Sequence, residues 1–414
     1  MKNPNNRLHS LSNPPAMTAR LMFILAAACG LIVANLYYAQ PLVGPISQSA
    51  GISPAASGLI VTMTQIGYVI GLLFIVPLSD LLENRRLVSM ALGVAAVGLT
   101  GAALANGMAM FFAAAVLIGA GSVGAQILVP YAASLAPADQ RGRIVGNIMS
   151  GLLLGIMLAR PAASLTAGLL GWRAVFLLSA VLMGLLIMLL LPMLPKRIPQ
   201  SRERYPQILL SLWDLLRTKP VLRRRALYQA CLFGSFSLFW TVVPLWLSDH
   251  FHASQNEIAV FALVGVAGAI AAPIAGRLAD KGWTRRLTGL AIVTAALSFA
   301  LTHAFAGNRI LSVIFFCAAA VLLDMAVSGN LVLGQQAIYA LGDEIRGRVN
   351  GLFMAIFFAG GALGSAVGGW TYAQGGWMLA SFAGICFPVL AFLYYLTELP
   401  RPSRRSRILP SGEI

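Results

Sequence analysis

Apolar stretches long enough to cross a membrane recur along almost the whole chain, and they limit its fold more than any other feature. A helix needs about 20 apolar residues to span a hydrocarbon core roughly 30 Å thick. Such runs occur twelve times, at about residues 21–42, 57–79, 87–105, 109–134, 144–166, 174–194, 226–247, 257–279, 287–306, 310–341, 349–371 and 377–397. We therefore predict an all-α membrane protein with twelve transmembrane helices.

The composition agrees, because 58% of the residues are hydrophobic and only 10% are charged. The formal charge of +16 would indicate a nucleic-acid partner in a soluble protein. Here the basic residues fall in tails and short turns, where they set the topology, and no nucleic-acid partner is expected. The 4 cysteines lie inside apolar runs at spacings too wide for a zinc or redox motif, so neither a metal site nor a cofactor is predicted.

Lysine and arginine indicate which side of the membrane each turn faces. If the tail of residues 1–20 is cytoplasmic, only Arg160, Arg173 and Arg309 of the 29 basic residues lie away from the cytoplasmic segments. This imbalance predicts that both termini are cytoplasmic in the inner membrane of a bacterium. The apolar run after Arg20 has no small-residue cleavage site, so we expect no removed signal peptide.

The segment 195–225 is the one long polar stretch between spans, and it separates a bundle at 21–194 from a second at 226–397, before a tail at 398–414. Within it, "ILLSLWDLL" is either a short amphipathic helix at the membrane surface or part of a simple tether. The halves repeat short motifs, since "PLSDLLENRR" at 77–86 matches "RLADKGWTRR" at 277–286. A duplicated six-helix unit is typical of transporters that work by alternating access.

In these turns the chain resembles the major facilitator superfamily, over essentially its whole length. It is nearest to the drug/proton antiporters and sugar-efflux transporters of that family. The family motif has a glycine, an aspartate four residues later, and basic residues five and six beyond the aspartate. The second turn fits it fully, whereas the first keeps the aspartate and both arginines but has Val76 and Glu83 where the family prefers glycine.

The resemblance implies that these turns form a cytoplasmic gate. Asp80 and Asp280 would act as latches, because an aspartate can accept hydrogen bonds from the N-terminus of a neighbouring helix and from arginine side chains. The alternative is that the basic turns only enforce topology. The candidate gate residues, with the "RGR" turns that follow, are Asp80, Arg85, Arg86, Arg141, Arg143, Gly276, Asp280, Lys281, Arg285, Arg286, Arg346 and Arg348.

The fifth predicted span carries a second, partial resemblance, to drug/proton antiporters of the same family. Their glycine pattern is present at Gly146 and Gly155, but Arg160 stands where the family has proline. On a helix, Arg160 lies about 180° from Gly151. We therefore expect the glycines to pack against a neighbouring helix and Arg160 to point into a central cavity, the alternative being an arginine that bonds backbone carbonyls or reaches outward.

Asp324 is the one acidic residue deep in a predicted span. A carboxyl group at this depth suits a proton carrier. Arg160 is the one basic residue at similar depth, and it belongs to the other half. We therefore predict a functional pair of Asp324 and Arg160 across the central cavity, with Asp324 as the proton-coupling group.

Neutral polar side chains in the spans are candidates for contact with the substrate. Amides and phenols cost less than charges in a membrane, and they suit neutral or amphipathic ligands. For each one alone, an interhelical hydrogen bond is an equally good interpretation. The candidates are Asn35, Tyr37, Tyr38, Gln40, Gln65, Tyr68, Gln126, Trp240, Ser328, Asn330, Gln335 and Gln336.

These features favour a secondary active transporter over an enzyme. No phosphate-binding GxxxxGKS/T loop and no HExxH motif is present, so neither ATP-driven transport by this chain alone nor metalloprotease chemistry is expected. We predict proton-coupled efflux of a small hydrophobic or amphipathic, drug-like compound by a functional monomer. The alternatives are proton-coupled export or uptake of a sugar or another metabolite and, less favoured, a non-transporting membrane receptor.

Overall fold

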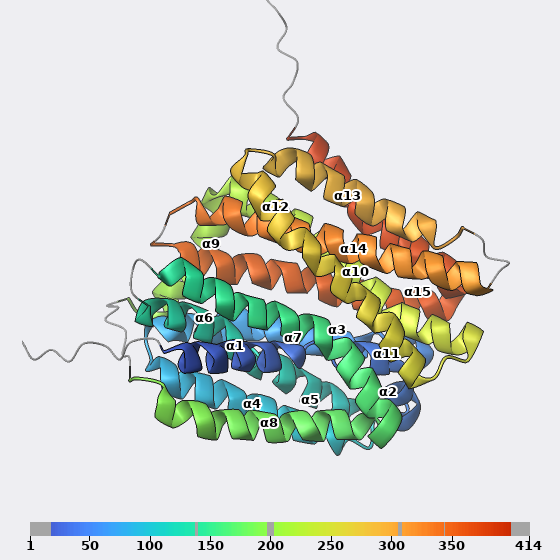
Figure 1. Ribbon diagram of the computed structural model, residues 1–414, viewed down its shortest axis with the longest axis horizontal. Helices are drawn as coiled ribbons and strands as arrows, with labels where there is room; N and C mark the ends of the chain where they lie inside the picture. The colour runs from blue at the N-terminus through green and yellow to red at the C-terminus, as the bar shows by residue number, and fades with distance from the viewer. Residues whose placement is uncertain (1–17, 137–139, 197–202, 305–308, 343, 399–414) are drawn as a thin grey trace, which may run out of the picture.

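The computed structural model describes residues 18–136, 140–196, 203–304, 309–342 and 344–398. This part of the chain is almost entirely helical and contains no strand (Figure 1). Its first half comprises α1 Ala19–Ala34, the short 3-10 helix η1 Gln40–Leu42, α2 Val43–Ala50, η2 Pro54–Ala56, α3 Leu59–Ile70, η3 Gly71–Ile75, η4 Val76–Asp80, α4 Asn84–Ala103, α5 Met108–Gly121, α6 Gly124–Leu135, α7 Arg141–Leu170 and α8 Trp172–Met193.

The second half follows a separate amphipathic helix, α9 Tyr205–Thr218. It comprises α10 Pro220–Phe251, α11 Gln255–Val264, the 3-10 segment η5 Gly265–Ile270, α12 Ala271–Asp280, α13 Thr284–Leu301, α14 Arg309–Tyr339 and α15 Arg346–Leu396. Figure 1 shows α1 to α8 below and α10 to α15 above, as two bundles lying side by side. The predicted all-α architecture of two bundles is confirmed.

Among the described residues, 10 helical segments are long and apolar enough to cross a membrane. One of them, α15, contains two helices, because Gly375 and Gly376 leave the helical conformation and Gly376 has a φ of 59°. A positive φ is easy for glycine, which has no Cβ. The shorter apolar helix α1 continues through η1 into α2. Counted in this way, the spans are the twelve that the apolar runs predict.

Close helix pairs within each half depend on glycine. A Cβ on Gly155 of α7 would lie 2.2 Å from the carbonyl oxygen of Gly30 in α1, and one on Gly364 of α15 would lie 2.0 Å from that of Gly234 in α10. Helices in lipid gain from such backbone contact, since van der Waals packing drives their association. The prediction that the fifth-span glycines pack against a neighbouring helix is therefore confirmed for Gly151 and Gly155, whereas Gly146 has no such neighbour.

The two halves make close backbone contact at one end of the bundle. We call the end with α9 and the turns before α4, α7, α13 and α15 the linker end, and the opposite end the far end. At the far end, Thr62 Oγ1 of α3 lies 2.8 Å from Ser365 Oγ of α15, and Ser164 Oγ of α7 donates to the Gln255 carbonyl at the start of α11 over 2.9 Å. A Cβ on Gly58 would lie 2.0 Å from the Ser365 carbonyl oxygen. The far end is therefore closed by backbone-to-backbone contact.

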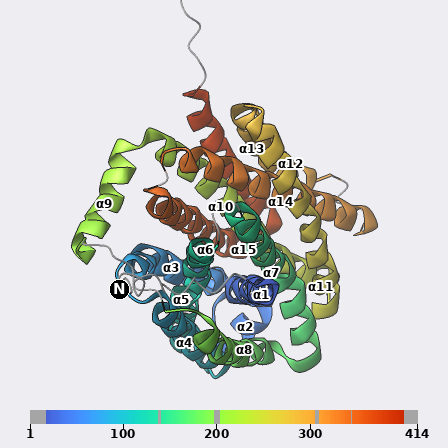
Figure 2. The same ribbon diagram turned by 60° about the vertical axis from the view of Figure 1, so that its left-hand side comes forward.

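Helix α9 contacts both halves at the linker end. The Tyr205 hydroxyl donates to the Phe74 carbonyl of η3 over 2.8 Å, while Arg348 of α15 bonds both Ser211 and Glu203. In the view of Figure 2, α9 lies at the outer edge of the molecule beside the two bundles. The amphipathic helix, one of the two interpretations of the sequence, is present. It links the halves along the chain and also contacts both of them through side chains.

Candidate functional site

Two buried charges, one from each half, lie face to face. Arg160 Nη2 of α7 is 3.9 Å from Asp324 Oδ2 of α14, and their side chains are 4% and 5% exposed. Each residue comes from a different half, so the contact crosses the boundary between the bundles. Pro161 follows Arg160 inside α7 and removes one backbone donor from the helix there. The pair that the sequence suggests is thus close enough to interact electrostatically.

Asp324 is held by a second contact and enclosed by glycine. Trp240 Nε1 of α10 donates to Asp324 Oδ1 over 2.9 Å. A Cβ on Gly265 would lie 2.6 Å from Asp324 Oδ2, and one on Gly268 would lie 2.3 Å from Asp324 Cβ. The η5 segment therefore approaches the carboxyl so closely that only glycine fits at these positions. Sequence reasoning missed both glycines, although their spacing of three residues on one helical face was an available signal.

Aromatic rings surround the Arg160 guanidinium. Its Cζ lies 4.0 Å from the ring centroid of Trp240, 5.0 Å from that of Phe236 and 5.9 Å from that of Tyr37. Such contacts stabilise a desolvated cation by about 2 kcal/mol. Among the described residues, Arg160 Nε and Nη1 have no hydrogen-bond partner. Rings and one carboxylate thus stabilise the guanidinium, and two of its nitrogens make no hydrogen bond to the described residues.

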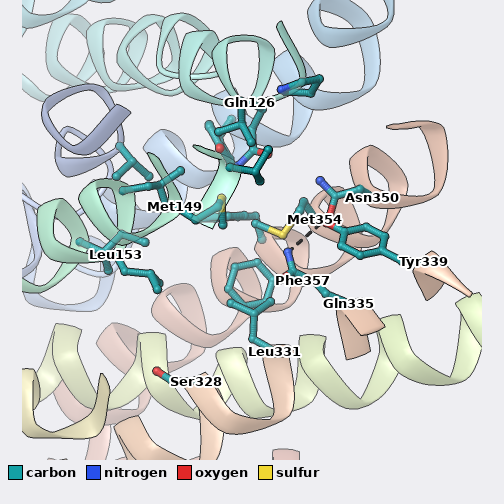
Figure 3. A pocket seen from close by; sticks show the side chains of 18 of the residues that line it. Gln126, Met149, Leu153, Ser328, Leu331, Gln335, Tyr339, Asn350, Met354 and Phe357 are labelled. Carbon is teal, nitrogen blue, oxygen red and sulfur yellow. Dashed lines mark hydrogen bonds between the residues drawn. The ribbon is translucent and has the colours of Figure 1, made fainter. Parts of the chain in front are cut away.

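A cavity of about 740 Å³ lies between the halves and reaches the linker end. Its volume falls within the range of small-molecule sites. Most of the wall is apolar, with Met149, Leu153, Leu331, Met354 and Phe357 facing the space (Figure 3). The polar part of the wall includes a small network, in which Gln335 Nε2 and the Tyr339 hydroxyl both donate to Asn350 Oδ1, over 3.4 and 2.9 Å.

Five of the predicted substrate-contact residues line this cavity: Tyr37, Tyr68, Gln126, Ser328 and Gln335. They come from both halves, and they form a polar minority in an apolar wall. A ligand in the cavity would therefore meet a few hydrogen-bonding groups at separated places. This arrangement suits a molecule with an apolar body and few polar groups.

The other seven predicted contact residues lie outside the cavity wall, and most of them bond other helices. Asn35 accepts from Ser179 of α8, Gln65 donates to Ser237 across the halves over 2.9 Å, and Asn330 donates to Gln229 over 2.7 Å. Their polarity serves helix packing, the interpretation that the sequence left equally open. Of the remaining four, Trp240 donates to Asp324 and Gln336 donates to Asp280. The other two, Tyr38 and Gln40, are buried.

Several wall residues gave no signal in the sequence. Phe236, Met354 and Phe357 are apolar residues in apolar spans, where nothing distinguishes a cavity position from a lipid-facing or packed one. Of these, Phe236 was the easiest to predict as a site residue, because it lies four residues before Trp240 and hence on the same face of α10. Asn350 was not predicted as a cavity residue because it lies close to a basic turn at the end of a predicted span.

In the first gate turn, the arginines bond the residue that replaces a family glycine. Arg85 Nε lies 3.2 Å from Glu83 Oε1, and Arg86 Nε lies 3.0 Å from Glu83 Oε2. Asp80 lines a smaller cavity together with Gly347 and Gly351 at the start of α15. The first latch aspartate is thus placed beside the N-terminal turn of a helix from the other half.

In the second gate turn, Asp280 accepts from Gln336 Nε2 of α14 over 3.3 Å. The nearest atom to a Cβ on Gly276 would be Val332 Cγ1, at 3.6 Å. Lys281 and Arg286 are exposed, as is Arg143 in the first half. Of the remaining basic residues of the predicted gate, Arg346 lies over the Tyr339 ring and Arg348 of α15 bonds Ser211 of α9. Arg285 is partly exposed, and the side chain of Arg141 lies outside the described part of the structure.

Comparison with known proteins decides the family. The model described as Major Facilitator Superfamily matches residues 22–236 and 225–412. The chain belongs to the major facilitator superfamily. It is 40% identical over 387 residues to the uncharacterized transporter YgaY of Escherichia coli O157:H7, covering 93% of this chain and 94% of the relative. It is 33% identical over 396 residues to the probable transporter SCO4007 of Streptomyces coelicolor, covering 94% and 90%.

Solved structures of the superfamily share the fold. A bacterial homologue of the human lysosomal transporter Spinster, in an inward-facing and unoccupied conformation, superposes with a TM-score of 0.72 at 15% identity, covering 91% of this chain and 95% of that one. A D-xylose-proton symporter gives 0.72 at 16% identity, covering 92% and 97%. At these identities the likeness concerns the fold alone. The protein is a multi-pass membrane transporter of the superfamily type.

Proposed function

We propose that this transporter moves a small amphipathic molecule by alternating access, coupled to protons through Asp324. The observation that carries the proposal is the position of the Arg160–Asp324 pair. One charge comes from each half, and two of the rings beside Arg160, those of Tyr37 and Phe236, form part of the cavity wall. Rocking of the bundles 21–194 and 226–397 would change both the access to the cavity and the separation of the pair.

The closed far end and the cavity at the linker end correspond to one state of such a cycle. Because the linker end carries most of the basic turns, we assign it to the cytoplasm. The structure is then inward-facing, in the inner membrane of a bacterium, with both termini cytoplasmic. Both halves belong to one chain, so a monomer is sufficient for the cycle.

Two substrate classes follow from different observations. The partial antiporter pattern on α7 and the apolar wall support efflux of hydrophobic or amphipathic drug-like compounds. Arg160 in the place of the family's proline supports a metabolite that makes a defined polar contact, moved outward or inward with proton coupling. Efflux of drug-like compounds is the first candidate, and transport of a metabolite is the second.

The test is accumulation of amphipathic dyes in energised cells that overexpress the protein, with and without an uncoupler. Overexpression should lower accumulation, and the uncoupler or Asp324→Asn should restore it. Asp214→Asn on α9 is the matched control, because Asp214 is exposed and lies outside the cavity wall. Unchanged accumulation for every dye would remove the support for drug efflux. A dye lowered equally by wild type and Asp324→Asn would argue against proton coupling through Asp324.

A further inference from the structure

The guanidinium of Arg160 has hydrogen-bonding capacity that the protein does not use. Its Nη2 faces Asp324 at 3.9 Å, which is beyond hydrogen-bond distance. Among the described residues, Nε and Nη1 have no partner at all, although the residue is only 3% exposed. Leaving buried charged donors unpaired is costly, so an arginine in this state is a strong site for an acceptor that arrives from outside the protein.

The position of Arg160 makes it reachable from the cavity. Tyr37 and Phe236, whose rings lie within 5.9 and 5.0 Å of its Cζ, both belong to the cavity wall. The guanidinium therefore lies one layer of side chains behind the wall. Rotation of these two rings would bring a ligand group into contact with it.

The charge of the cavity wall has one sign in the part of the chain that the structure describes. There, Arg346 near the linker end is the single charged residue in the wall, and no described aspartate or glutamate belongs to it. A molecule that enters from the linker end thus passes one cation and approaches a second. The cation in the wall favours anionic over cationic ligands along the path, and at its end an anion would compete with Asp324 for Arg160.

We propose that the substrate is an amphipathic organic anion whose carboxylate or sulfonate group binds the guanidinium of Arg160, where Nε and Nη1 have no partner among the described residues. Its apolar body lies against the methionine and aromatic wall around Met149, Met354 and Phe357 (Figure 3). Hydrogen bonds from a guanidinium to such oxyanions are charge-assisted and therefore stronger than those between neutral groups. The anion competes with Asp324 for the same cation, which places substrate binding next to the proposed coupling group. The inference rests on the proposed transport function and specifies its substrate class.

The experiment measures binding to the purified full-length protein by quenching of tryptophan fluorescence and by thermal unfolding. The probes are phenylpropionate, naphthylacetate and pyrenebutyrate, each compared with its primary amide and with the corresponding primary amine. At least one carboxylate should bind about tenfold or more tightly than its amide, a difference of about 1.4 kcal/mol. The amine should bind most weakly.

Variants identify the group responsible. Replacing Arg160 alone would leave Asp324 without its cation, so the informative variant is Arg160→Gln combined with Asp324→Asn, which keeps the site neutral. It should retain the fold and lose the preference for carboxylate over amide. Arg217→Gln, an arginine of α9 that lies against the Trp213 ring and outside the cavity wall, should retain the preference.

Each opposing result overturns the inference. These results are binding of an amide or amine as tight as that of its carboxylate, a preference that persists in the double variant, and no binding by any probe. The proposed function is judged separately, by uncoupler-sensitive dye transport. Transport of neutral or cationic dyes without any preference for carboxylates would leave the transporter function standing and refute the anion site.

Discussion

Arg160 and Asp324 show how two costly side chains become tolerable together. Each charge loses its water when buried, and this cost is several kcal/mol for a single ion. For Asp324, part of this cost is offset by the Trp240 N–H and by Arg160, and for Arg160 part is offset by the surrounding rings. The contribution of each residue to stability therefore depends on the other.

Removal of one charge is expected to be worse than removal of both. Asp324→Asn or Arg160→Gln alone should destabilise the protein by about 3–5 kcal/mol, because the remaining charge stays buried without a partner. The double variant should recover most of this loss. The measurement is the unfolding temperature of the purified proteins in one detergent. If the losses of the two single variants simply add in the double variant, the side chains are not coupled.

The two charges were predictable from the sequence because a lone charge in an apolar span has few explanations. Neutral polar residues were much less predictable. Gln126 and Gln335 line the cavity, whereas Gln65 and Asn330 bond neighbouring helices. An amide costs little enough in a membrane that either use is stable, so its chemistry alone does not say which one applies.

At the scale of helices, the two halves use the same device at equivalent places. Gly155 brings α7 against α1, and Gly360 and Gly364 bring α15 against α10. Small residues at helical spacing allowed this contact to be expected in the first half. The sequence did not reveal what α9 contacts, since an amphipathic pattern shows that one face is covered and not what covers it.

Valine at Gly155 is expected to separate α7 from α1. Its Cβ would lie 2.2 Å from a backbone oxygen, which a rotamer change cannot relieve, and overpacking of this kind costs typically 1–3 kcal/mol or more. Gly146→Val on the same helix is the control, because no atom lies within 4 Å of a Cβ there. Unfolding temperature and folded yield should fall for the first variant only. Equal behaviour of the two would mean that the close contact is dispensable.

At the scale of the molecule, apolar run length determined the number of spans and their division into halves directly. It did not determine which end is closed, because the same helices form both states of an alternating-access cycle. The closed far end depends on a few backbone contacts, of which the contact between Gly58 and Ser365 is the tightest. Such packing contacts cannot be predicted from the composition of the spans.

A side chain at Gly58 is expected to keep the far end from closing. Gly58→Val should shift the protein toward the state that is closed at the linker end. The reporter is Ser134→Cys in the cavity wall, in a protein without its native cysteines, labelled in inside-out membrane vesicles by a maleimide that does not cross membranes. Labelling should slow several-fold with Gly58→Val. Gly93→Val, where a Cβ meets nothing within 4 Å, should leave the rate unchanged. An unchanged rate in Gly58→Val would show that this contact does not control closure.

Helix α9 has a mechanical consequence. It is a rod of 14 residues, about 21 Å long, fastened to the first half at Phe74 and to the second at Arg348. Two bodies joined by a rod of fixed length cannot separate without limit at that end, so the width of the opening at the linker end has an upper bound. The largest molecule that can enter is thus set partly by a helix that never touches it.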